Sequence, residues 1–170
     1  MFLPADDDDL PAIVALMNRA YRGNIGWTTE NAYLAGDRTT EALLRAELTA
    51  KPSAILLKWE DAHSDDIGGC VWLEPLEADV WYMGSLTIDP ARQNQGLGRK
   101  LLAAAENWAR PRGAERMRMT VINIRETLIA WYQRRGYALT GATEPFPYDD
   151  ARFGKPLRDD LSFVVLEKAL

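Results

Sequence analysis

Residues 86–102 read LTIDPARQNQGLGRKLL, and this segment decides the fold because a strand ends in it and a helix begins. Pro90 ends the strand, since it has no amide hydrogen to donate to a sheet ladder. Gly96 and Gly98 then open a helix whose first amides have no acceptor inside the helix. We therefore predict a tight turn that presents free main-chain donors at a helix N-terminus.

Free amides at the positive end of a helix dipole favour an anion, and glycines let it approach closely. Arg92, Arg99 and Lys100 add positive charge. A Gly-x-Gly helix start is equally typical of an N-terminus capped by water or by side chains. A dinucleotide fingerprint requires a third glycine where Leu101 stands, and a Walker loop requires Gly-Lys-Ser/Thr where residues 98–100 read GRK, so neither applies.

The residues before this segment predict two helices followed by an antiparallel meander. Apolar residues recur at helical spacing over residues 9–22, and Asp6 to Asp9 are typical of caps for that helix rather than of metal ligands. A loop at 23–38, broken by a short helical turn, leads into a helix near 39–50. Apolar runs bounded by turn residues predict strands at 54–59, 67–73 and 80–88.

The residues after it alternate helices with strands. An apolar face predicts a helix from Gly96 to Ala109, and a period of two predicts a strand at 116–121. A helix near 124–135 ends at Gly136, and the last strand follows a polar excursion at 144–160. A meander followed by alternating strands and helices indicates a mixed sheet with helices on its faces.

Composition excludes several function classes. With 170 residues and 47% hydrophobic residues, we expect a single domain spanning 1–170. A net charge of −5 argues against bulk nucleic-acid binding. Cys70 is the only cysteine, so neither an internal disulfide nor a Cys/His zinc cluster is expected. No run is long and apolar enough to span a bilayer, which predicts a soluble cytoplasmic protein without a membrane partner.

Two motifs carry a resemblance to the GNAT superfamily of N-acetyltransferases. Residues 93–98, QNQGLG, match the family's Q/R-x-x-G-x-G/A loop, and residues 86–90 resemble its cofactor-binding strand. Residues 131–137, WYQRRGY, are similar to the family's last helix signature, a Tyr followed four residues later by Gly and an aromatic residue. The resemblance implies a mixed α/β fold with a mostly antiparallel six- to seven-stranded sheet, splayed between the fourth and fifth strands and flanked by about four helices.

The resemblance also implies a site that uses acetyl-CoA as acetyl donor and needs no metal. The amides of residues 93–99 would hold the pyrophosphate, and the main chain of residues 86–88 would pair with the pantetheine arm. An amide near Ile88 would polarise the acetyl carbonyl, and Tyr132 would protonate the departing sulfur. A tyrosine that only packs its ring in the core is the alternative for Tyr132. The candidate cofactor-binding residues are Leu86, Thr87, Ile88, Gln93, Asn94, Gln95, Gly96, Leu97, Gly98, Arg99 and Lys100.

The general base is not identified by any motif. Glu74 and Asp79 flank predicted strands and are candidate carboxylates, although both are more typical of solvated turn residues. His63 lies in a polar turn, where we expect it to be exposed and not catalytic.

One position departs from the family pattern. Many members carry an Asn seven residues before the tyrosine, but this chain has Arg125 there and Asn123 nine residues before it. Asn123 followed by Glu126 resembles a capping box for the last helix, so either a cap or a cofactor contact remains open for Asn123.

The resemblance places the acceptor between the loop at 23–38 and the excursion at 144–160. Aromatic and acidic residues recur in both, which suits a cationic amine with an apolar body, and equally suits solvated acids with aromatic anchors. We expect direct attack by a primary amine in a ternary complex, with a small molecule favoured over a protein. The alternatives are a protein N-terminus or lysine, or a non-catalytic module that binds acyl-CoA. Exposed tryptophans would indicate a homodimer surface. The candidate lining residues are Trp27, Glu30, Asp37, Arg38, Phe146, Tyr148, Asp149, Asp150, Phe153, Asp159 and Asp160.

Overall fold

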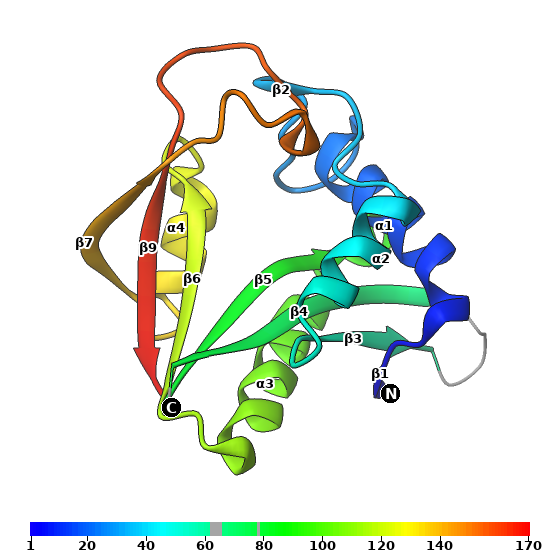
Figure 1. The fold of residues 1–170 in the computed structure, drawn as a ribbon, viewed down its shortest axis with the longest axis vertical. Helices are drawn as coiled ribbons and strands as arrows, with labels where there is room; N and C mark the ends of the chain where they lie inside the picture. Colours follow the sequence, from blue (N-terminus) through cyan, green and yellow to red (C-terminus); the bar gives the residue numbers. More distant parts are fainter. Residues whose placement is uncertain (62–65, 78) are drawn as a thin grey trace.

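The computed structural model describes residues 1–61, 66–77 and 79–170 (Figure 1). These residues form a mixed sheet of seven strands in the order β1-β3-β4-β5-β6-β9-β7, together with four α-helices. All strand pairs are antiparallel except β5 and β6. His63, expected in an exposed turn, lies outside the described residues. The elements are β1 (Phe2–Pro4), α1 (Leu10–Arg22), β2 (Leu34–Ala35), α2 (Glu41–Ala50), β3 (Ile55–Glu60), β4 (Ile67–Glu77), β5 (Val80–Ile88), α3 (Leu97–Ala109), β6 (Arg116–Ile122), α4 (Glu126–Gln133), β7 (Ala138–Pro145), β8 (Lys155–Pro156) and β9 (Ser162–Ala169).

The sheet splays between β5 and β6, its fourth and fifth strands. Pairing covers only Val80–Tyr82 opposite Arg116–Arg118, after which the two strands diverge, as Figure 1 shows. The Tyr82 hydroxyl and the Thr120 Oγ1, 3.3 Å apart, bridge the two strands near the start of the opening. Beyond Tyr82, the β5 edge that faces β6 has no ladder partner among the described strands, so it is open to pairing with a ligand. The predicted fold class and splay are confirmed.

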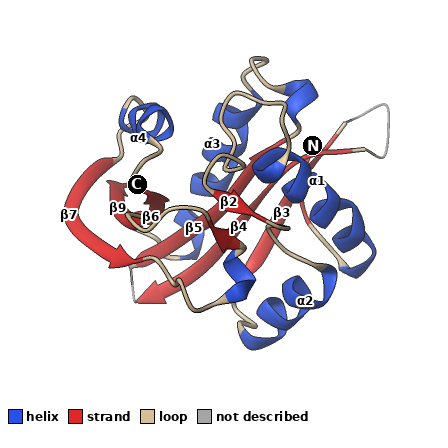
Figure 2. Cartoon of the chain, turned by 90° about the horizontal axis from the view of Figure 1, so that it is seen from above, coloured by secondary structure: helices blue, strands red, loops and turns tan. Residues whose placement is uncertain are grey.

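Helices cover both faces of the sheet (Figure 2). The first face packs against α1 and α2, where Ile13 and Leu16 join Cys70 in one core cluster. The second packs against α3 and α4, where Leu101 joins Val71 in another. Cys70 and Val71 are adjacent in β4, and they face different helices because successive strand residues point to opposite sides.

The acidic run before α1 caps a short turn and not the helix itself, because Asp9, the N-cap of α1, makes no side-chain capping hydrogen bond. The Asp6 carboxylate accepts a hydrogen bond from the Asp8 amide (3.0 Å), and the Asp9 carboxylate accepts one from the Asp6 amide (2.8 Å). This reciprocal pair caps a short 3₁₀ turn at Asp7–Asp9 that runs directly into α1. The Asp9 carboxylate also pairs with Lys58 at 2.6 Å, which lowers its pKa against the opposing effect of burial.

The predicted capping role of Asn123 is wrong. Arg125 occupies the N-cap of α4, and no side chain caps that helix. The Asn123 side-chain amide instead donates through its nitrogen to the Asp160 carbonyl (3.1 Å), and its Oδ1 accepts from the main-chain amide of Ser162 (3.1 Å). Asn123 therefore fixes the chain that enters β9.

Two short strands link the loops above the splay, and the sequence patterns did not predict them. Leu34 pairs with Pro156, and Ala35 with Lys155, so that β2 and β8 form a separate two-stranded sheet. This sheet joins the segment after α1 to the segment before β9, above the open end of the splayed strands in Figure 1.

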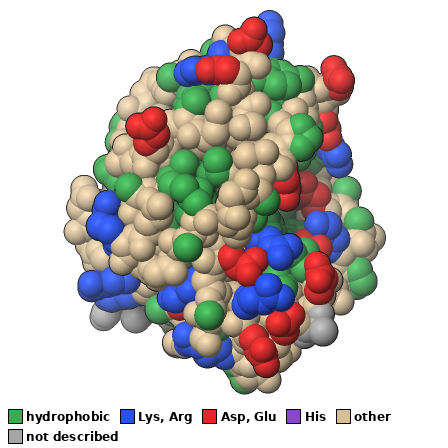
Figure 3. All heavy atoms as spheres, turned by 90° about the vertical axis from the view of Figure 1, so that its left-hand side faces the viewer, with side chains coloured by type: hydrophobic (Ala, Val, Ile, Leu, Met, Phe, Trp, Pro, Cys, Tyr) green, Lys and Arg blue, Asp and Glu red, His purple; other side chains and the backbone are tan. Residues whose placement is uncertain are grey.

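Opposite charges are interspersed on the face that Figure 3 views from the β7 side, most clearly over its lower half. Ion pairs also join β6 and β9, with Arg116 lying 3.1 Å and Arg118 lying 2.9 Å from Glu167. None of the described helices has the length and apolarity that a membrane span requires.

Candidate active site

Two cavities meet inside the splay. The larger, about 720 Å³ and here called the large cleft, lies between β5, the turn before α3, and α4. The smaller, about 290 Å³ and here called the small cavity, lies between β5, β6 and the loops above them. The residues that line both are Tyr21, Leu86, Arg125, Leu128 and Tyr132.

The turn before α3 presents its amides to the large cleft. Asn94 and Gly96 have positive φ values of 65° and 75°, and this left-handed geometry lets neighbouring amides converge on an anion. Within the described part of the chain, the main-chain amides of residues 93–99 donate no hydrogen bond to a turn carbonyl or to a side chain. These donors therefore need an acceptor from outside the protein.

Gly96 and Gly98 are glycines for different reasons. Gly96 is the N-cap of α3 in the left-handed conformation, which side chains rarely adopt. A Cβ on Gly98 would lie 3.5 Å from the Trp131 ring and 3.7 Å from Ile88, ordinary contacts that the fold would tolerate. Because Trp131 and Ile88 both line the large cleft, the missing Cβ leaves the cleft open.

A cluster of arginines also lines the large cleft. Arg99 comes from α3, and Arg134 and Arg135 follow Tyr132 at the end of α4. The Arg135 guanidinium stacks 3.6 Å from the Trp131 ring centroid. Burial, followed by repulsion from Arg134 and Arg99, lowers the pKa of Arg135. Three like charges held this close favour a ligand with several negative charges.

The predicted cofactor residues lie together with one exception. Residues 86–88 and 93–99 all line the large cleft, whereas Lys100 is exposed outside it. Arg92 also turns away and pairs with Asp61 at 2.9 Å. Arg134 and Arg135 were not predicted as site residues, although both stand inside the WYQRRGY motif.

A bulge in β5 shapes the wall between the two cavities. The register with β4 shifts between Cys70 and Trp72, and Ser85 has a φ of 49°. The Tyr21 hydroxyl donates a hydrogen bond to the Leu86 carbonyl at 3.3 Å. This bulge turns the β5 main chain at the point where the strand faces both cavities.

Tyr132 lies where the cavities meet. Its side chain is 6% exposed and packs edge-to-face against Trp131 and Tyr137, with ring centroids 5.1 and 5.9 Å away. Burial raises the pKa of the Tyr132 phenol well above its usual value. The group is therefore neutral at physiological pH and can donate a proton, but it is not a base.

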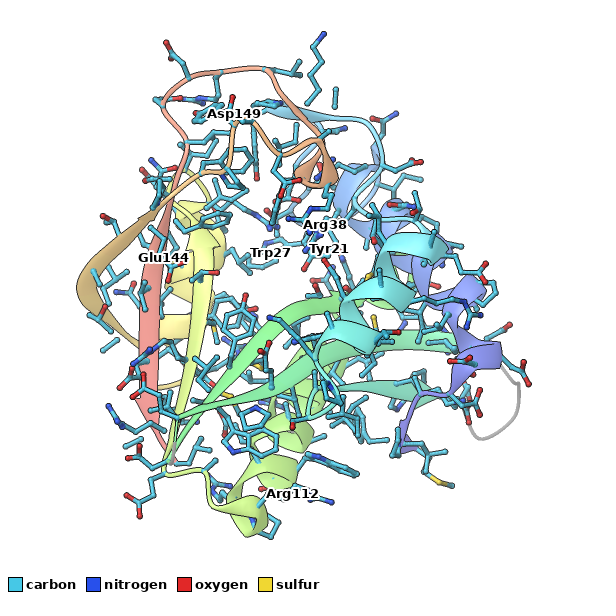
Figure 4. All side chains as sticks on the ribbon, viewed as in Figure 1. Tyr21, Trp27, Arg38, Arg112, Glu144 and Asp149 are labelled. Carbon is cyan, nitrogen blue, oxygen red and sulfur yellow. The ribbon has the colours of Figure 1, made fainter. Side chains whose placement is uncertain are left out.

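Arginines dominate the ionisable lining of the small cavity. Glu30 is buried and lies 3.7 Å from Arg22 and 3.5 Å from Arg125. Arg38 donates to the Ser85 hydroxyl at 3.3 Å, and Glu144 lies at the exposed rim. In Figure 4, Arg38 and Tyr21 are on the α1 side of the opening, and Glu144 is on the β7 side.

Neither carboxylate considered as a base lines either cavity. Glu74 accepts hydrogen bonds from Lys51 (2.8 Å) and from the Trp72 indole (3.2 Å) within the sheet. Asp79 pairs with Arg116 at 3.2 Å, which lowers the pKa of that carboxyl. Both side chains stabilise the fold away from the site.

The acids expected to line an acceptor site are mostly elsewhere. Asp150 pairs with Arg152, and Asp160 pairs with Arg158. Asp37 and Asp149 line a separate hollow that does not adjoin β5. The members of the predicted set that line the small cavity are Glu30, Arg38, Phe146 and Phe153. Trp27 is 46% exposed at the edge of the large cleft, where its amide donates to the Gln93 side chain at 2.6 Å.

Among the described residues, no group of three or more His, Cys, Asp or Glu side chains is placed to hold a metal ion.

A curated protein shares part of this sequence. The acetyl-coenzyme A carboxylase carboxyl transferase subunit beta of Cuscuta gronovii is 34% identical over 74 residues, which are 43% of this chain and 15% of that protein. The chain thus spans a small part of that relative's length, and the likeness says nothing of a shared activity.

Solved structures share the whole architecture. A GNAT family acetyltransferase from Elizabethkingia anophelis, with acetyl-CoA bound, has a TM-score of 0.64 at 20% identity and covers 77% of this chain and 84% of its own. The ribosomal-protein-alanine N-acetyltransferase from Brucella melitensis has a TM-score of 0.71 at 18% identity, and the match covers 100% of this chain and 99% of that protein. The model of the acetyltransferase (GNAT) family matches residues 11–137. This chain therefore belongs to the GNAT acetyltransferase family.

Proposed function

We propose that this protein transfers an acetyl group from acetyl-CoA to a primary amine of a small molecule, by direct attack within a ternary complex. One observation carries the proposal: Tyr132 lines both a cleft that contains open main-chain amides and three arginines and a separate small cavity. The first would hold the donor and the second the acceptor, so the two substrates would meet beside a neutral proton donor.

The large cleft fits the chemistry of coenzyme A. The free amides of residues 93–99 and the N-terminus of α3 would receive the pyrophosphate, with Arg99, Arg134 and Arg135 balancing the phosphate charges. The unpaired edge of β5 at residues 86–88 would pair with the amide groups of the pantetheine arm. A relative solved with acetyl-CoA bound supports this use of the fold.

Acetyl-CoA would supply the acetyl group as a thioester. Transfer forms a C–N bond and breaks the C–S bond, the amine loses protons, and the sulfur gains one. Tyr132 would give its proton to the sulfur and recover one from solvent. Because burial raises its pKa, the phenol remains protonated and ready to donate over the pH range in which an amine becomes nucleophilic.

A thiol-release assay tests the proposal. Protein, acetyl-CoA and a panel of primary amines should release free CoA faster than hydrolysis in the absence of amine. Loss of general acid catalysis in Tyr132→Phe should lower kcat by roughly 100-fold or more while CoA affinity stays the same. Equal losses of turnover and CoA affinity would refute the role of Tyr132, and CoA binding without any amine-dependent release would favour a binding module.

Tyr33→Phe is the matched control. The Tyr33 hydroxyl is buried without a hydrogen-bond partner among the described residues, and it lines neither cavity. Removing it should leave both turnover and CoA affinity unchanged.

A further inference from the structure

The small cavity carries a net positive charge. Among the described residues, the charged groups that line it are three guanidinium groups and two carboxylates, which leaves one positive charge in excess. An acceptor whose only charge is an ammonium would be repelled there, since like charges repel one another at close range and water screens them only partly inside a cavity. An acceptor that also bears an anionic group would balance the positive charge of the cavity.

Arg22 is not available to bind that anion. Its guanidinium donates to the Gly36 carbonyl at 2.9 Å and to the Phe153 carbonyl at 3.2 Å, which ties the two loops above the splay together. The same side chain lies beside Glu30, so its charge is largely balanced.

Arg125 is only partly balanced. It lies 3.5 Å from Glu30, which it shares with Arg22; it also donates a 3.4 Å hydrogen bond to the Thr28 hydroxyl and lies 5.7 Å from the Tyr21 ring centroid. The Arg125 side chain is only 9% exposed, and its Nε is buried without a hydrogen-bond partner among the described residues. A buried guanidinium with an unused donor is unfavourable unless a ligand or water accepts from it.

Arg38 is the guanidinium best placed to receive an anion. Within the described residues no carboxylate pairs with it; its head group contacts the Ser85 hydroxyl and lies 5.3 Å from the Tyr21 ring centroid. Its base is fixed as well, because the Asn18 oxygen accepts from the amides of Arg38 (2.7 Å) and Thr39 (3.1 Å). Arg38 is thus preorganised while keeping its fork of donors open to the cavity.

The size and apolar walls of the small cavity limit the rest of the acceptor. About 290 Å³ is at the low end for small-molecule sites and suits a molecule of roughly amino-acid size. The remaining walls are largely aromatic and apolar, and they include Phe146, Phe153 and Phe163. An aliphatic or aromatic side chain would fit against them.

We infer that the acceptor is an amino acid, whose carboxylate binds Arg38 while its amine lies beside Tyr132 and its apolar side chain packs on the phenylalanines. The inference rests on the proposed function, and it replaces the expectation of an acceptor recognised by acidic loop residues. The cationic surroundings would also favour the neutral, nucleophilic form of the amine.

The test measures acceptor binding directly, in protein saturated with CoA. Each probe set compares an amino acid with its carboxamide and with the amine that lacks the acid group: phenylalanine, phenylalaninamide and phenethylamine, with matching leucine and methionine sets. Calorimetry should show at least one amino acid binding roughly 10- to 100-fold more tightly than its two neutral-ended analogues. The carboxamides also imitate a peptide N-terminus, so equal binding of the carboxamide would point to a protein acceptor and overturn the inference.

Variants assign the effect to Arg38. Arg38→Gln should weaken amino-acid binding to the level of the carboxamide without changing carboxamide or CoA binding, and Arg38→Lys should restore part of the difference. Arg158→Gln, which removes an exposed arginine paired with Asp160 outside both cavities, is the control and should have no effect.

The outcomes separate this inference from the proposed function. Failure of the native protein to bind CoA would reject the proposed function itself. The amino-acid acceptor would be rejected if CoA binds normally but no amino acid binds. It would also be rejected if the analogues without a carboxylate bind as tightly as the amino acids. An equal loss of acid and amide binding in Arg38→Gln would reject Arg38 as the carboxylate anchor.

Discussion

Gly98→Ala should make the protein at least as stable while weakening its binding to CoA. The added Cβ would lie 3.5 Å from Trp131 and 3.7 Å from Ile88, so it fits without displacing either side chain. Alanine is favoured over glycine in a helix by up to ~1 kcal/mol, which corresponds to a rise in Tm of roughly 0 to 4 °C for a chain of this size. The methyl group would lie between Trp131 and Ile88 in the lining of the large cleft, where we propose that the pyrophosphate binds.

The expected loss of affinity follows from what the methyl group displaces. Because the family motif also admits alanine at this position, the methyl group should weaken a charge-assisted hydrogen bond to phosphate rather than abolish it, and we expect roughly a two- to tenfold increase in the Kd for CoA. Thermal unfolding and calorimetry on the same preparation measure both quantities. The reasoning about this turn is refuted if folded Gly98→Ala protein binds CoA as tightly as the native chain does.

Gly113→Ala is the matched control. Gly113 has a φ of +93°, and nothing lies within 4 Å of an added Cβ. Alanine there should cost about 1–2 kcal/mol of stability through backbone strain and leave CoA binding unchanged. Gly98→Ala should therefore weaken CoA binding without loss of stability, and Gly113→Ala should lower stability without weakening CoA binding.

Three further predictions concern the fold around the site. Glu106→Gln weakens the buried contacts of that carboxylate with Lys168 (2.8 and 3.0 Å), so thermal unfolding should show a loss of about 1–3 kcal/mol with CoA affinity unchanged; equal stability would contradict the contact. Asn123→Ala leaves the Ser162 amide without its acceptor and should destabilise by a similar ~1–3 kcal/mol, whereas a loss confined to CoA binding would instead show a cofactor contact. Stability should fall as the pH rises through about 9 to 10, because the buried Cys70 thiol and the folded tyrosines with raised pKa values stay protonated while the unfolded chain ionises, so the unfolded state binds fewer protons. Unfolding and tyrosine absorbance near 295 nm, followed together in a pH titration, should change together, and early ionisation of the folded protein would contradict the burial of Tyr21, Tyr33, Tyr132 and Tyr137.

Local patterns predicted most of the fold because the features that determine it are local. The apolar stripe of α3 and the alternation of β6 each reflect packing against one face of the sheet, so they can be read in a short window. The strands β1, β2 and β8 have two or three residues each and carry no periodic signal. Their pairing depends on partners more than fifty residues away, as for Leu34 and Pro156.

The donor side of the site was easier to predict than the acceptor side for the same reason. The turn at residues 93–99 is one contiguous segment, and its glycines and the helix start after it indicate an anion-binding site. Lys100, the next residue of α3, does not line the large cleft, so a contact of its side chain with the cofactor stays a prediction. The small cavity assembles residues such as Arg38, Arg125 and Glu144 from three distant segments, and no local spacing marks them as neighbours.

The central claim is that the open main-chain donors between Gln93 and Arg99 bind coenzyme A. Calorimetric titration of the folded native protein with CoA tests it most directly. We expect saturable binding at one site, weakened by Gly98→Ala and unaffected by Tyr132→Phe. The absence of any heat of binding at millimolar CoA, with folding verified in the same sample, would contradict it.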